Sequence, residues 1–285
     1  MEFRIQEDIA LVLELLALSK SGLARQLGIS RPTLDHWMSE NANPRQAALD
    51  AFYGYAFSHD VPLNEIKAQL YKEELERTGA TVLFHGSKSG IQGPLSLTAS
   101  RPNNDFGQGF YCGESLEQSA LFVTHFPNSS LFMVAFDPTG LSKEEFNVDR
   151  DWMLAVASYR GRLREYLEHP LVQDVRSRVE KADYLIAPIA DNRMYETIDL
   201  FIDGEITDLQ CQHSLSATNL GKQYVFATQR SLDHLRILEQ CFLSTAERKH
   251  YEQVRQHGTA AGLAKAKVAR RQYRNQGLYI EELLS

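Results

Sequence analysis

Apolar residues in the first 80 positions recur at the three- and four-residue spacing of amphipathic helices. The spacing is seen at Ile9, Leu13, Leu16, Leu23, Leu27, Ile66 and Leu70. We therefore expect residues 1–78 to form an all-helical domain.

Near residue 78 the pattern changes to short β-branched and aromatic runs. The run TVLFHGS is typical of a strand that is closed by a turn. Strands are expected at 81–85, 109–112, 130–137, 183–189, 198–202 and 223–228. Helices are expected at 115–125, 142–146, 150–180 (broken or continuous) and 231–241. Strands and helices alternate without a regular repeat, which is typical of an α+β or a mixed α/β fold, and the fold class expected for residues 79–243 is α+β.

The last segment, residues 244–285, returns to a helical pattern and carries a run of basic residues without an acid. They are Lys265, Lys267, Arg270, Arg271 and Arg274. Such a run is usually a solvated helix face, and the alternative is contact with nucleic acid or an acidic partner. We expect a basic helical C-terminal tail.

Charge and composition narrow the classes of protein that fit. The 285 residues carry a net charge of −7, which argues against a general nucleic-acid surface, so any such contact must be local. No apolar run reaches about 18 residues and the N-terminus is acidic, so neither a membrane span nor a signal peptide is expected. The spacing of the three cysteines suggests no disulfide framework and no metal site. We expect a cytoplasmic protein that binds no metal and no membrane.

The segment SKSGLARQLGISRPTLDHWMSENANP (19–44) resembles the helix-turn-helix of the Cro/repressor class. The expected first helix is Ser21–Leu27, and Gly28 occupies the tight turn, where a residue that tolerates positive φ is needed. Ser30 is placed to cap the second helix, with Pro32 in its first turn. The resemblance implies DNA binding through Arg31, Thr33 and His36. The alternative is a helical hairpin used for packing or dimerisation.

A glycine-rich segment, NNDFGQGFYCGESLEQSALF (103–122), carries the candidate chemistry. Gly107 and Gly109 precede a short apolar strand, which is followed by a helix that begins near Ser115. Glycines at these positions would let the backbone approach a flat or charged ligand. The alternative is an ordinary hairpin followed by an amphipathic helix.

Three motifs, FHGS (84–87), DFGQGFY (105–111) and KQYVF (222–226), resemble the signature strands of ADP-ribosyltransferases of the diphtheria-toxin and poly(ADP-ribose) polymerase type. With IAPIADNRMY (186–195) and GKQYVFATQRSL (221–232), the chain more closely resembles a bacterial family of uncharacterised ADP-ribosyltransferase-like proteins. Members of that family are often regarded as toxins or phage-defence effectors. The resemblance covers residues 81–240 and implies a split β-sheet with flanking helices.

The resemblance assigns roles in binding NAD. It implies that His85 bonds the adenosine ribose, that Gly86 offers its backbone to the nicotinamide amide, and that Tyr111 stacks on the nicotinamide ring. Ser119 and Phe122 would contact the carboxamide and the other side of the ring. Their spacing independently places these two residues on one helical face, although plain helix packing explains that spacing as well.

The third signature position is Gln223, where the polymerase branch has a glutamate. The amide can still position a ribose, but it cannot supply negative charge to a cationic transition state. This departure puts chain elongation and fast hydrolysis in doubt and leaves mono-ADP-ribosyl transfer. Asp105 and Glu205 are carboxylates that could contribute. The remaining positions expected to bind NAD are Ser87, Asn104, Asp105, Phe106, Gly107, Gly109 and Arg193.

Two of these assignments have a structural alternative. Arg193 would reach the diphosphate or pair with Asp191 or Glu196 at the surface, and Asn104 would brace the loop that carries Asp105.

The expected function is therefore an NAD-dependent mono-ADP-ribosyltransferase with His85, Tyr111 and Gln223 as its catalytic residues and NAD as its substrate. The acceptor would be a protein or a nucleic acid, and DNA and a cognate antitoxin are the further partners implied. The alternative is a helix-turn-helix regulator whose larger domain binds NAD or a nucleotide without turnover, which Gln223 favours. A hydrolase that uses Cys112 is poorly supported, because nothing nearby in the sequence would lower the pKa of that thiol.

Overall fold

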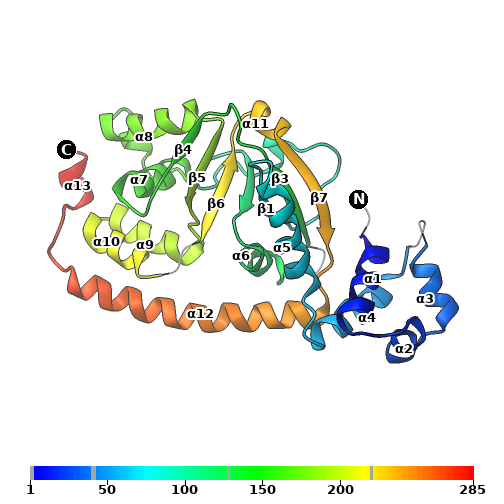
Figure 1. The fold of residues 1–285 in the computed structure, drawn as a ribbon. Coiled ribbons are helices and arrows are strands. Elements are labelled where there is room, and N and C mark those ends of the chain that lie inside the picture. Colours follow the sequence, from blue (N-terminus) through cyan, green and yellow to red (C-terminus); the bar gives the residue numbers. More distant parts are fainter. Residues whose placement is uncertain (1–2, 40–42, 127–128, 219–220) are drawn as a thin grey trace. The chain divides into compact units, whose positions relative to one another are not determined.

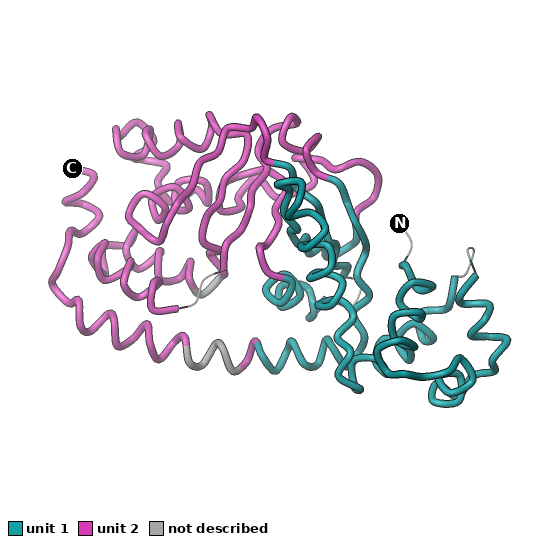
Figure 2. Tube along the Cα trace, in the orientation of Figure 1, with its two compact units in different colours: residues 1–90, 116–137, 236–254 teal, residues 91–115, 138–235, 255–285 magenta. Residues whose placement is uncertain are grey.

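The computed structural model describes residues 3–39, 43–126, 129–218 and 221–285, except for the side chains at 192–193 and 257–261 (Figure 1). The chain divides into two compact units, coloured teal and magenta in Figure 2. Unit 1 consists of residues 1–90, 116–137 and 236–254, and unit 2 of residues 91–115, 138–235 and 255–285. Because neither unit is contiguous in sequence, the boundaries expected after residues 78 and 243 remain predictions.

Unit 1 begins with helices, as the sequence predicts. They are α1 (Ile5–Leu15), α2 (Lys20–Gln26), α3 (Arg31–Trp37), α4 (Gln46–Ser58) and α5 (Leu63–Glu76). The inward faces of α1 to α4 share one apolar core, whose fully buried members include Ile9, Leu23, Leu34 and Phe52. Burial of these large side chains, rather than helix propensity, stabilises such short helices.

The turn between α2 and α3 has the predicted local structure. The Ser19 and Ser30 hydroxyls accept hydrogen bonds from the backbone N–H groups of Gly22 and Thr33, at 3.0 and 3.2 Å. Gly28 adopts φ +67°, which a residue with a side chain rarely adopts. The first helix lies one residue earlier than expected.

Three strands belong to unit 1: β1 (Thr81–Ser87), β3 (Ser130–Phe136) and nearly all of β7 (Leu235–Cys241). β1 and β3 are antiparallel, with His85 opposite Phe132, and β7 lies next to β3. Helix α6 (Leu116–Val123) and α5 both contact β1. The helix expected at 231–241 is wrong: α11 (Gln229–Asp233) is a single short helix, and β7 follows it.

Unit 2 holds the other four strands in the order β4 (Lys143–Glu145), β5 (Tyr184–Pro188), β6 (Lys222–Phe226) and β2 (Phe110–Gly113). β4 and β5 are parallel, whereas the other neighbours are antiparallel, so the arrangement is mixed and open. The helices are α7 (Arg150–Tyr159), α8 (Pro170–Lys181), α9 (Asn192–Ile202), α10 (Asp208–Ser216), α11 and α13 (Ile280–Leu283), with 3-10 turns at Leu97–Ala99 and Arg164–Tyr166. Trp152, Leu185, Phe201 and Val225 are fully buried in its core.

Two other expectations for unit 2 are wrong. Residues 198–202 belong to α9 rather than to a strand, and residues 143–145 form β4 rather than a helix. The long helix expected at 150–180 is broken into α7 and α8. The α+β class is nevertheless correct, with an all-helical start.

The helical tail is α12 (Thr245–Gln272), of which residues 255–272 belong to unit 2. Its buried face there includes Ala266 and Ala269, and the Tyr273 ring stacks on the ring of His213 from α10. Within the basic run, Arg270 is half-buried and the other four residues, Lys265, Lys267, Arg271 and Arg274, are exposed. No helix within the described ranges is long and apolar enough to cross a membrane.

Candidate functional site

The loop that precedes β2 is organised around the carboxylate of Asp105, which is 6% exposed. Its Oδ1 accepts hydrogen bonds from Arg160, at 2.9 Å from Nε and 2.5 Å from Nη2. Its Oδ2 accepts from the side-chain nitrogen of Gln223 at 2.9 Å and from the backbone N–H of Ala190 at 3.3 Å. One carboxylate thus connects this loop with β6, with the end of α7 and with the segment after β5.

Tyr111 on β2 is bonded to the same loop. Its hydroxyl donates to the carbonyl of Gly107 at 2.7 Å and accepts from the N–H of Phe106 at 3.2 Å. Burial raises the pKa of Tyr111, so the phenol remains protonated at neutral pH and continues to donate.

The strand register brings two of the predicted catalytic residues together. β2 and β6 are antiparallel, with Tyr111 opposite Val225 and Gly113 opposite Gln223. Opposite residues share a face, and residues two apart on one strand do so too, so Tyr111 and Gln223 lie on the same face of this pair. Gly113 places no side chain beside Gln223.

Unit 1 brings a second group of predicted residues together, where β1 contacts α6. A Cβ added to Gly86 would lie 2.7 Å from Val123 Cγ1, 3.1 Å from the carbonyl oxygen of Ser119 and 3.6 Å from Phe122 Cδ1. The buried Ser119 hydroxyl donates to the carbonyl of Phe84 at 3.2 Å, whereas Phe122 is 57% exposed. Ser119 and Phe122 therefore both approach β1 at Gly86, which follows His85.

Replacing Gly86 with Ala is expected to destabilise the protein by about 1–3 kcal/mol, because the new methyl group would force β1 and α6 apart. Urea denaturation followed by circular dichroism measures this change. The matched control is Gly54→Ala in α4, where the added Cβ would meet only Ser244 at 3.9 Å, and we expect that variant to be at least as stable as the natural protein. Equal midpoints for the two variants would contradict the close approach of β1 and α6.

The other predicted residues have mainly structural contacts. Ser87 donates to the carbonyl of Gly90 at 2.9 Å, and the carbonyl of Asn104 accepts from Gly107 N at 3.1 Å. A Cβ on Gly109 would lie 2.9 Å from the carbonyl of Phe226, so only glycine fits beside β6 there. The Arg193 side chain lies outside the described residues. Glu205 is exposed. It is not among the described residues that form hydrogen bonds with Asp105 and Gln223.

Sequence reasoning missed Arg160, which directly follows α7. Besides Asp105, its guanidinium donates to the carbonyl of Ala190 at 2.7 Å and lies 4.0 Å from the ring centroid of Tyr195. Nothing in the sequence signals this role, because Arg160 lies 55 positions after its partner Asp105.

The structure does not favour Cys112 as a nucleophile. Cys112, Cys211 and Cys241 are all buried and free, and burial raises the pKa of each thiol. Among the residues that the structure describes, no group of three or more His, Cys, Asp or Glu side chains could hold a metal ion.

The predicted DNA-binding residues lie on α3, with Arg31 and Thr33 in its first turn and His36 in its last turn. Arg31 and His36 are exposed, and the Thr33 hydroxyl lies 2.7 Å from that of Ser30. Asp35 pairs with Lys20 at 2.9 Å and with Arg31 at 3.6 Å. The hydrogen bond from Lys20 lowers the pKa of Asp35, so this acid stays charged and partly neutralises both cations.

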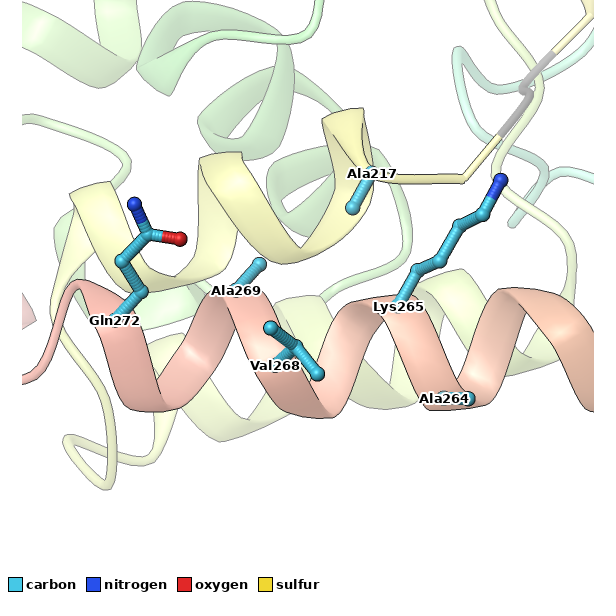
Figure 3. A pocket seen from close by; sticks show the side chains of 6 residues that line it. All are labelled: Ala217, Ala264, Lys265, Val268, Ala269 and Gln272. Carbon is cyan, nitrogen blue, oxygen red and sulfur yellow. The ribbon is translucent and has the colours of Figure 1, made fainter.

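An open groove of about 390 Å³ lies beside α12 (Figure 3). One lining residue follows α10 and the others belong to α12: Ala217, Ala264, Lys265, Val268, Ala269 and Gln272. None of these six described residues is aromatic or acidic, and none is a predicted NAD-binding residue. We therefore do not regard it as the candidate site.

These features define an α+β protein whose candidate site residues lie on β1 and α6 in unit 1 and on β2, β6 and the Asp105 loop in unit 2. A family model described as "Protein of unknown function (DUF3990)" matches residues 81–237, which is more than half of the chain. The chain belongs to this family. No curated protein and no solved structure matches the chain.

Proposed function

We propose that the chain is an NAD-dependent mono-ADP-ribosyltransferase, which uses NAD as a substrate and modifies a protein or nucleic-acid acceptor. The observation that carries the proposal is the register of β2 and β6, which puts Tyr111 and Gln223 on one face, with the Asp105 loop bonded to both. An aromatic ring beside a buried hydrogen-bonding amide suits a flat cationic ring that is attached to a sugar. In unit 1, the approach of Ser119 and Phe122 to Gly86 supports the role that the resemblance gives to β1 and α6.

The proposed reaction needs no covalent intermediate. The bond between the nicotinamide nitrogen and the ribose anomeric carbon breaks, and nicotinamide leaves with the electron pair. A bond forms between that carbon and a nucleophilic atom of the acceptor, which loses its proton to solvent or to a base. The rate then comes from positioning the reactants and from stabilising the charge that develops in the transition state.

We further propose that α2 and α3 form a helix-turn-helix that presents Arg31, Thr33 and His36 to DNA. The two serine caps and the positive φ of Gly28 support this assignment. Such a fusion suits a cytoplasmic toxin or phage-defence effector whose helical segment serves autoregulation or the binding of a cognate antitoxin.

The direct test is to incubate the protein with labelled NAD and cell lysate and to measure transferred label and free nicotinamide. We expect His85→Ala and Tyr111→Ala to lower both products by roughly 100-fold, because each removes a group that positions NAD. His59→Ala is the matched control, since His59 is an exposed residue at the end of α4. Products no higher for the natural protein than for His85→Ala would refute the enzymatic proposal.

Gln223 favours one alternative, namely a DNA-binding regulator whose larger domain holds NAD without turnover, since an amide adds no negative charge to the site. Saturable NAD binding without release of nicotinamide would favour this alternative over the transferase.

A further inference from the structure

The side chain of Gln223 is held at one end by two acceptors. Its nitrogen Nε2 lies 2.9 Å from Asp105 Oδ2 and 3.0 Å from the carbonyl oxygen of Pro188, and the residue is only 7% exposed. A primary amide nitrogen carries two hydrogens, and neither a carboxylate nor a carbonyl oxygen can donate one. Both donors of the Gln223 amide are therefore used inside unit 2.

This chemistry also determines which way the amide points. If the group were turned by 180°, its oxygen would face the oxygens of Asp105 and Pro188 with no hydrogen between them. Asp105 Oδ2 and the carbonyl of Pro188 would then each lose one donor, and the amide nitrogen would lose both of its acceptors. Any further hydrogen bond made by this amide must consequently be accepted by its oxygen, Oε1.

Asp105 can impose this orientation because it is itself fixed. Arg160 binds its other oxygen through two nitrogens, and the backbone N–H of Ala190 bonds the same oxygen as Gln223 does. Arg160 in turn is held by the carbonyl of Ala190 and the ring of Tyr195. The guanidinium also balances the charge of the carboxylate, so the group is neutral as a whole.

We propose that Asp105 is a positioning residue for the Gln223 amide. It holds the amide in the orientation in which only Oε1 can bond a ligand, and thereby selects a ligand group that donates a hydrogen bond, such as a sugar hydroxyl. The carboxylate also polarises the amide, which strengthens Oε1 as an acceptor. Position 223 carries an amide in place of a carboxylate. The carboxylate of Asp105 would thus act on the ligand indirectly, through its hydrogen bond to that amide. Applying this selection to the ribose of NAD rests on the proposed function.

The first test is independent of any activity and compares Gln223→Glu with Asp105→Asn/Gln223→Glu. In Gln223→Glu two carboxylates would meet, and the pair would hold a proton well above the pH at which a free carboxyl loses it. Among the described residues, the other titratable groups that interact with Asp105 are Arg160, Tyr111 and Tyr195. A proton held more tightly in the folded state means stability that is present at low pH and lost as the pH rises.

We therefore expect the melting temperature of Gln223→Glu to fall, relative to the natural protein, between about pH 5 and pH 8. The double variant should lack most of this fall, because the amide introduced at position 105 can donate to the new carboxylate. Identical pH profiles for the two variants would overturn the proposal.

The second test measures ligand selection by calorimetry, with NAD and an NAD analogue that lacks the 2′-hydroxyl of the nicotinamide ribose. The natural protein should prefer NAD by roughly tenfold, the equivalent of one hydrogen bond. Asp105→Asn frees the amide to turn and should remove the preference, whereas Asp105→Asn/Gln223→Glu should restore it. Asp174→Asn, at an exposed site on α8, is the control and should keep it.

The two tests separate the two proposals. If neither the natural protein nor any variant binds NAD, the transferase proposal fails, and the pH profiles of the melting temperature still decide the role of Asp105. If NAD binds and Asp105→Asn keeps the natural preference, the positioning role is wrong while the transferase proposal stands.

Discussion

Replacing Lys67 with Met is expected to lower the free energy of unfolding by about 3–5 kcal/mol, because it would leave two buried carboxylates without their cation. The Lys67 ammonium lies 2.9 Å from Asp8 and also pairs with Glu239. Both carboxylate side chains are 1% exposed, and that of Lys67 is 10% exposed. Met has a similar length and no charge, so the variant removes the pairing and keeps most of the packing.

The cluster ties the helical start of unit 1 to its strands. Asp8 comes from α1, Lys67 from α5 and Glu239 from β7, while the Tyr53 and Tyr71 hydroxyls donate to Asp8 and Glu239 respectively. Burial lowers the pKa of Lys67, but the attraction of Asp8 and Glu239 outweighs that effect and raises the pKa overall. Lys67 is therefore charged at neutral pH.

The pH dependence of the Lys67→Met defect follows from the same contacts. Burial raises the pKa of Glu239 even beside Lys67, and removing the cation raises it further. A carboxyl with a raised pKa in the folded state supplies stability at low pH that is lost as the pH rises. The defect should accordingly be larger at pH 8 than at pH 5 in urea denaturation. Lys72→Met, on the exposed side of α5, should change stability by no more than about 0.5 kcal/mol, and equal midpoints for the two variants would contradict the cluster.

The contact between Glu239 and Lys67 helps to explain why β7 could not be predicted from the sequence. Leu232, Leu235 and Leu238 follow a helical spacing, and 231–241 contains few β-branched residues. What makes 235–241 a strand is its pairing with β3 and the burial of Glu239 against Lys67, and both are long-range contacts. The N-terminal helices were predictable because their caps and apolar spacing act within a few residues.

The two errors in unit 2 have different causes. In 198–202, β-branched and aromatic residues suggested a strand, yet Ile198 and Phe201 are buried three positions apart on α9, and Met194 extends that helical spacing. That periodicity could have corrected the prediction. For 143–145 no such signal exists, because Lys and Glu favour helices and only the pairing with β5 makes these residues a strand.

For the candidate site, the strands that carry Tyr111 and Gln223 were predictable, and the contacts between the candidate residues were not. The motif around Tyr111 and Gln223 follows from local strand patterns, and the register places both on one face. The bond between Asp105 and Gln223 joins residues 118 positions apart, and no pattern in the sequence signals it. The contact between Arg160 and Asp105 is likewise not signalled by any pattern in the sequence. From the sequence, the site at Gln223 lacks a negative charge, whereas the structure places the carboxylate of Asp105 at hydrogen-bonding distance from Gln223.

Replacing Arg160 with Met is expected to lower the free energy of unfolding by about 3–5 kcal/mol, since the buried side chain of Asp105 would lose the cation that pairs with it. The fluorescence of Trp152, which is fully buried in α7, measures this change in a Trp37→Phe background, because the chain has two tryptophans.

Arg162→Met is the matched control for Arg160→Met. Arg162 lies two residues further along and bonds Asp199 and Asp203 at 2.6 and 2.5 Å, but its side chain is 35% exposed, so its loss should cost about 1 kcal/mol or less. Arg160→Lys should recover part of the loss, because an ammonium restores the charge without the paired hydrogen bonds of a guanidinium. If Arg160→Met were as stable as Arg162→Met, Asp105 would not depend on its cation. The carboxylate could then no longer be regarded as rigid enough to orient Gln223.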